Sequence, residues 1–175
     1  MNMVLHYDVR NGPIMKAAKM ALQTGNVNYV LIWVPEESEN QLKNLLEKTF
    51  CKRRDRKDVQ DVALDGYFKT VSRLHRSGER VLYTCIKPDD LNESQIVPKV
   101  ERAIEIGDVE EIIGAIPPTR EGYLRQRLRN VIDKKNYDVN NVAAGRAYVS
   151  AFIDFIVYVH NLTTSIPGEK SHAEH

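Results

Sequence analysis

The chain has few cysteines and no excess of either charge, and these shortages exclude several classes of protein. Cys51 and Cys85 are the only thiols among 175 residues, which is too few for a cysteine-based metal cluster. The 25 basic side chains of Lys and Arg nearly balance the 24 acidic ones of Asp and Glu, and the formal net charge is +1. No global field therefore attracts nucleic acid or an anionic membrane, and we expect neither as a partner.

Long apolar runs and an export signal are also missing from the sequence. The longest apolar stretch, Ala147 to Val159, is interrupted by Ser150 and Asp154 and is shorter than the ~20 residues that a bilayer span needs. The first residues, MNMVLHYDVRNGP, show neither the basic segment nor the apolar core of a signal peptide. We therefore expect a soluble cytoplasmic protein with no membrane contact, whose two cysteines are reduced.

Apolar residues recur at helical spacing through most of the chain. The first stripe follows the i, i+3, i+4, i+7, i+8 pattern and consists of Ile14, Ala17, Ala18, Ala21 and Leu22. Caps and spacing predict seven further helices, over residues 27–34, 35 to about 51, 58–77, 98–106, 108–116, 118–135 and 140–162. Gly78 should end the helix over 58–77. Residues 80–88 have an extended character without a partner strand. The prediction is an all-α bundle of about eight helices.

An internal duplication is the strongest pattern in the sequence. Gly25-Asn26-Val27 and the apolar residues up to Pro35 match Gly107-Asp108-Val109 and the residues up to Pro117 at an offset of 82, which becomes 85 after a three-residue insertion. We predict one helical domain, 1–165, built from two pseudo-two-fold-related repeats, 12–79 and 98–162, joined by a crossover loop over 80–97. Residues 166–175 are expected to be a disordered tail. The last helix is apolar on nearly every face, so it should be the central element.

Two histidines occupy equivalent places in the predicted repeats. His75 and His160 each lie on the apolar stripe of the last helix of a repeat, so both should point inward. Two inward imidazoles could bind a divalent metal ion, with a carboxylate such as Asp8 or Asp65 and with His6 as further ligands. The alternative is structural, with each imidazole at the edge of the core and donating to a backbone carbonyl. No His-Glu-x-x-His or Glu-x-x-His pair fixes a ligand geometry, so both interpretations stay open.

Other charged residues suggest packing rather than chemistry. Asp61 and Arg146 correspond under the 85-residue offset, and an ion pair between the repeats would help to specify how they pair. The basic residues within 52–57 and 120–129 are not interleaved with aromatics, so we interpret them as solvated surface. A phosphate loop, a dinucleotide fingerprint and a nucleophile elbow are all missing. The sequence leaves open whether the protein is an enzyme.

Short motifs spread over most of residues 6–162 resemble those of a family of uncharacterised prokaryotic proteins of unknown function. They are His6-x-Asp8, Gly12-Pro13, Gly25-Asn26-Val27-Asn28, Trp33-Val34-Pro35, Leu74-His75-Arg76, Tyr83-Thr84, Lys87-Pro88 and Gly145-Arg146-x-Tyr148-Val149. Members of that family often begin this region with His-Cys-Asp behind an export signal, whereas Tyr7 replaces the cysteine here. The start is also similar to the amino-terminal hook of nickel superoxide dismutase. That hook needs two cysteines and a free histidine amine, and five residues precede His6, so we reject this activity.

Two function hypotheses follow from the residues. In the leading one, a metal ion or small ligand binds between the two repeats through the inward histidines. In the alternative, the protein is an interaction module or homodimer without catalytic activity, which docks through an exposed helix face or the crossover loop. An enzyme ranks third, because it would need one of the histidines in an open cleft beside a carboxylate.

Overall fold

The computed structural model describes residues 13–55, 60–82, 96–114 and 116–164. Within these ranges the chain forms eight α-helices and two short 3-10 helices, without a strand, so the all-α prediction is confirmed. The N-terminal segment with His6 and Asp8, most of the predicted crossover loop and the predicted tail lie outside the described residues.

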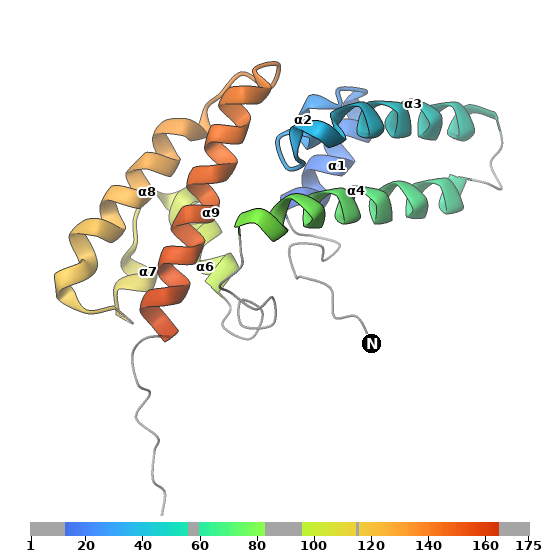
Figure 1. Ribbon diagram of the computed structural model, residues 1–175. Coiled ribbons are helices and arrows are strands. Elements are labelled where there is room, and N and C mark those ends of the chain that lie inside the picture. The colour runs from blue at the N-terminus through green and yellow to red at the C-terminus, as the bar shows by residue number, and fades with distance from the viewer. Residues whose placement is uncertain (1–12, 56–59, 83–95, 115, 165–175) are drawn as a thin grey trace, which may run out of the picture.

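The N-terminal half of the protein, residues 13–82, places two short helices against a long helical hairpin (Figure 1). Its elements are α1 (Pro13–Thr24), α2 (Asn28–Leu31), the 3-10 helix η2 (Glu36–Ser38), α3 (Glu39–Asp55) and α4 (Gln60–Leu82). The apolar stripe predicted for α1 is buried at Ile14, Ala18, Ala21 and Leu22, which confirms the spacing argument.

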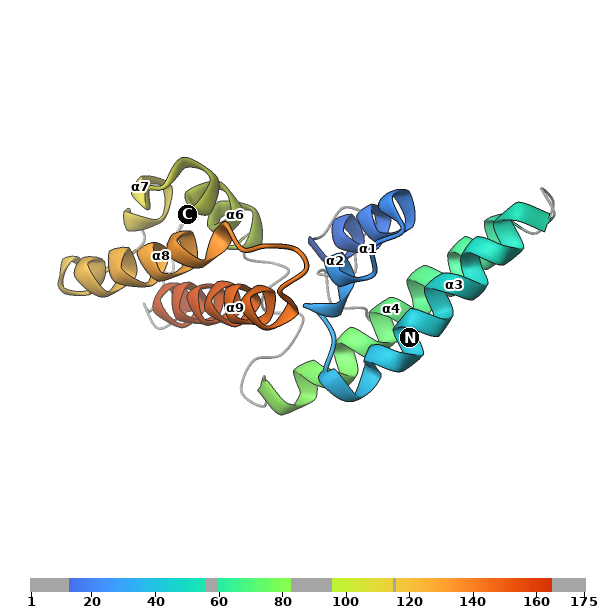
Figure 2. The ribbon, with the colours of Figure 1, turned by 90° about the horizontal axis from the view of Figure 1, so that it is seen from above.

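The C-terminal half, residues 96–164, has the same order of elements. They are α6 (Ile96–Ile106), α7 (Glu110–Ile113), the 3-10 helix η4 (Pro118–Arg120), α8 (Glu121–Lys135) and α9 (Val142–Thr164). Helices α8 and α9 lie antiparallel, and α9 also packs on α6. Seen from above, the two hairpins extend away from each other, and α1 and α2 lie beside the end of α9 between them (Figure 2).

Local details recur in the two halves at the offsets seen in the sequence. Gly25 and Gly107 both have positive φ, 75° and 84°, and their amides donate to the carbonyls of Ala21 and Ala103. The same left-handed cap therefore ends both α1 and α6. Glycine is the residue that adopts this backbone conformation without strain. The bounds of α2 and α7, and of η2 and η4, differ by 82 residues.

Gly78 does not end α4, contrary to the prediction. The helix continues to Leu82, and a Cβ at position 78 would lie 3.0 Å from Cδ of Pro35. Glycine therefore permits a close approach of the helix to Pro35, a role that the sequence alone does not distinguish from a helix stop. Residues 80–82, expected to be extended, are helical, and α6 begins at Ile96 rather than at Pro98.

Helix α9 is less enclosed than its composition indicates. One stripe along it is exposed, consisting of Ala143, Ala147, Ser150, Asp154 and Asn161. Residues Val142–Thr163 are also long and apolar enough to cross a membrane by length and composition, so the estimate that no run reaches this length was wrong. In the structure α9 packs against α8 and α6, and the core helix of a soluble protein meets the same criterion.

Candidate functional site

A cavity of about 250 Å³ lies at the junction of the two halves. The N-terminal half contributes the segment between α2 and η2 and one turn of α4, and the C-terminal half contributes the first turns of α9. Most of the walls are apolar, and the residues that line the cavity are Ile32, Trp33, Val34, Pro35, Glu36, His75, Gly78, Arg146, Val149, Ser150 and Ile153. Neither half could form this cavity alone.

His75 projects from α4 into the wall of this cavity. Its side chain is only 3% exposed, and its Nδ1 lies 2.6 Å from the carbonyl oxygen of Trp33. A carbonyl only accepts, so Nδ1 carries the proton and the lone pair of the neutral ring is on Nε2. The indole of Trp33 meets the imidazole edge-on, with ring centroids 6.1 Å apart. This is the backbone bond of the structural alternative, but histidines that bind metals make the same bond.

His160 is also buried, at 5% exposure, but it is not among the residues that line the junction cavity. It lies two turns of α9 beyond Ile153, the last α9 residue of that wall. The described part of the chain holds no group of three or more His, Cys, Asp or Glu side chains that could bind a metal ion. Since His6 and Asp8 lie outside that part, the predicted four-residue metal site stays a prediction.

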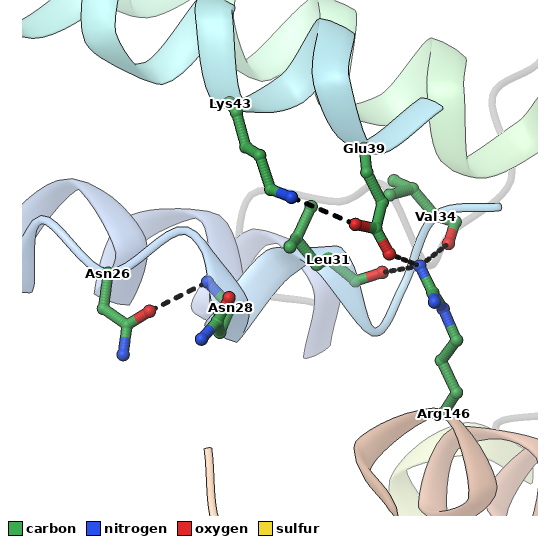
Figure 3. Close-up of polar contacts among 7 residues, drawn as sticks. All are labelled: Asn26, Asn28, Leu31, Val34, Glu39, Lys43 and Arg146. Atoms are coloured by element: carbon green, nitrogen blue, oxygen red, sulfur yellow. Dashed lines mark hydrogen bonds and ion pairs between the residues drawn. The ribbon is translucent and has the colours of Figure 1, made fainter. Parts of the chain in front are cut away.

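Arg146, in the first turns of α9, connects the two halves beside the cavity (Figure 3). Its Nη2 donates to Oε1 of Glu39 at 2.7 Å and to the carbonyls of Leu31 and Val34 at 3.4 Å each. The carbonyls belong to the end of α2 and the turn after it, and that of Leu31 also accepts from the amide of Val34 at 3.2 Å. One guanidinium therefore satisfies both a carboxylate and a helix end of the opposite half.

The hydrogen bond from Arg146 lowers the pKa of Glu39 from its usual value, and Lys43 adds to the effect at 3.1 Å. Sequence reasoning selected Arg146 for a contact between the halves, but with Asp61 as its partner. The side chain of Asp61 lies outside the described residues. Glu39 was missed because it looks like an ordinary acidic residue in the first turn of a helix, where the helix dipole favours it.

Two further contacts fix the halves around this site. Oδ1 of Asn140, in the α8–α9 turn, accepts hydrogen bonds from Nδ2 of Asn26 and of Asn28, each at 3.2 Å. A Cβ at Gly145 would lie 2.4 Å from Cγ2 of Ile32, closer than real Cβ atoms approach any neighbour. Glycine at this position therefore allows α9 to touch the α2 segment directly.

A second cavity of about 170 Å³ is also lined by Trp33. Phe152 forms part of its wall and meets Trp33 edge-on, with ring centroids 6.1 Å apart. The charged residues Glu101, Glu105 and Lys135 also line it. Trp33, itself 8% exposed, therefore lines both cavities.

Comparison with known proteins places the chain in a family without assigning it a reaction. No curated protein and no solved structure matches the chain. A family model described as "Family of unknown function (DUF6448)" matches residues 11–158, a range that includes the junction residues Trp33, His75 and Arg146. The resemblance noted in the sequence is thereby confirmed: the chain belongs to this family of unknown function.

Proposed function

We propose that the protein binds a small, mostly apolar molecule with one carboxylate in the cavity between its two halves. The observation that carries the proposal is the composition of the junction cavity. Most of its walls are apolar, and polar side chains reach it from both halves: Glu36 and His75 from one, Arg146 and Ser150 from the other. Apolar concavities with a few convergent polar groups are the usual form of ligand sites.

The volume of the cavity restricts the size of the ligand. At about 250 Å³ it is just below the range of roughly 300–1,000 Å³ that is usual for drug-sized ligands. A ligand of metabolite size fits this space. The ring of Trp33 and the side chains of Val149 and Ile153 would cover its apolar part, which the hydrophobic effect favours.

Arg146 supplies the reason for the carboxylate. A guanidinium has five N–H donors, and Nη2 alone makes the three bonds to the N-terminal half. Its Nε is buried and has no hydrogen-bond partner among the described residues. Buried donors are almost always satisfied, so this group favours a ligand with an acceptor oxygen, and a carboxylate forms the stronger bond.

The fluorescence of Trp33 offers a direct test, because it is the only tryptophan of the chain and lines the cavity. We expect hexanoate to change its emission in a saturable way, and hexylammonium, which has no acceptor, to leave it unchanged. Val149→Phe, which fills the cavity, should abolish the response. Tyr123→Phe, at an exposed position of α8, is the matched control. A response that survives Val149→Phe in a protein of unchanged helicity would contradict the proposal.

The same titration tests the metal hypothesis. His75 lies edge-on to Trp33, so a paramagnetic Cu²⁺ or Ni²⁺ ion bound at His75 would quench the emission strongly. Quenching that His75→Gln removes and that a chelator reverses would favour the metal site over the carboxylate site. Quenching retained in His75→Gln would show that the ion binds elsewhere.

A further inference from the structure

Trp33 lines both cavities at the junction of the halves. Among the described residues it is the one side chain that lines both of them. Its indole meets the imidazole of His75, which lines the first cavity, and the ring of Phe152, which lines the second, each edge-on with ring centroids 6.1 Å apart. The space between the halves is therefore two chambers with a common aromatic wall.

The two chambers differ in their chemistry. The chamber of His75 and Arg146, about 250 Å³, contains the proposed acceptor for a carboxylate. The second chamber, about 170 Å³, is lined by Ile104 and Phe152 and by the charged residues Glu101, Glu105 and Lys135. An apolar chain whose carboxylate binds Arg146 would reach Trp33 before it could enter the second chamber.

We infer that Trp33 determines the length of the ligand that the protein accepts. The inference rests on the proposed function and adds a limit to it: the ligand ends at the indole. Trp33 has little freedom to move aside, because the residue is only 8% exposed and its carbonyl accepts a hydrogen bond from His75. Packed aromatic side chains of this kind stay close to one rotamer.

A series of straight-chain carboxylates from butanoate to dodecanoate measures this limit by calorimetry. Each methylene that becomes buried should raise the affinity about fourfold. For the native protein we expect the affinity to rise with chain length and then level off where the chain meets Trp33. In Trp33→Ala the two chambers join, and the rise should continue to longer chains.

Phe152→Leu is the matched control, because Phe152 lines the second chamber and not the first. It enlarges the space behind the wall while the wall remains, so the chain length of the plateau should not change. Trp33→Leu removes less side-chain volume than Trp33→Ala, so it should shift the plateau to longer chains by a smaller amount. It also replaces the alanine variant in the test if that variant does not fold. Far-UV circular dichroism checks the helical content of each variant.

The outcomes separate this inference from the proposed function. If no carboxylate binds to the native protein at any length, the proposed function is wrong and the inference falls with it. If carboxylates bind but the native protein shows no plateau, Trp33 is not a barrier. A plateau that stays at the same chain length in Trp33→Leu and Trp33→Ala would overturn the inference and leave the proposed function in place.

Discussion

Replacing Gly145 by alanine tests whether the two halves are packed as tightly as the structure indicates. Alanine is favoured over glycine inside a helix by roughly 1 kcal/mol, so Gly→Ala in open space stabilises a helix. At position 145 the new Cβ would lie 2.4 Å from Cγ2 of Ile32 and 3.0 Å from Cε2 of Tyr137. Ile32 is 5% exposed and belongs to the core, so it cannot simply turn into solvent.

Overpacking of this kind costs about 1–3 kcal/mol. After subtraction of the helix preference, Gly145→Ala should change the free energy of unfolding by roughly 0–2 kcal/mol in the destabilising direction. Gly66→Ala is the matched control, since Gly66 lies inside α4 and nothing would be within 4 Å of its Cβ. It should stabilise by roughly 1 kcal/mol.

The two variants should therefore differ by about 1–3 kcal/mol, or roughly 2–12 °C in Tm for a chain of this size. Differential scanning calorimetry under identical conditions measures the difference. Equal stabilisation by Gly145→Ala and Gly66→Ala would refute the reasoning, because it would mean that α9 and the α2 segment can separate without cost.

Three further perturbations test the core and the ion pair. Arg146 lowers the pKa of Glu39, so the ion pair stabilises the fold fully above about pH 4.5, and this stabilisation is lost as the pH falls through the lowered pKa. Urea unfolding between about pH 3 and 6 should show the loss, and the Glu39→Gln variant should not show it. Tyr67→Phe removes the buried bond from Oη to the carbonyl of Ala18 at 3.2 Å and should cost about 1 kcal/mol in thermal unfolding. Phe155→Ala should cost about 3–5 kcal/mol by urea denaturation, because the ring is fully buried; a cost below ~1 kcal/mol would contradict its core position.

The helices were predictable because their signals are local. Apolar spacing, Pro13 at the first turn and the glycines at 25 and 107 each act within a few residues of their own position, and the structure has the predicted elements there. Gly78 was misread because a glycine at the end of a helical pattern is more often a cap than a point of close approach. The difference lies in Pro35, which is 43 positions away in the chain.

The candidate site depends on contacts between residues far apart in the sequence, and these have no local signal. Arg146 and Glu39 are 107 positions apart, and Trp33 meets Phe152 across the junction. Periodicity placed His75 and His160 on apolar stripes, and both are buried. Periodicity did not show that His75 lines a cavity with Arg146 whereas His160 does not. The spacing of apolar residues predicts which face of one helix is buried, but a cavity depends on how the two halves pack together.

Differences between the two halves are more informative about function than their similarities. The similarities, such as the paired glycine caps, describe a scaffold that each half needs in order to fold. Under the proposed duplication His75 corresponds to His160, but three other junction residues have no equivalent in the other half: Trp33 corresponds to Ala115, Gly145 to Gln60 and Arg146 to Asp61. A small residue, an amide and a carboxylate cannot supply the aromatic wall, the close helix approach or the guanidinium. The residues at the corresponding positions therefore cannot form a second cavity of this composition.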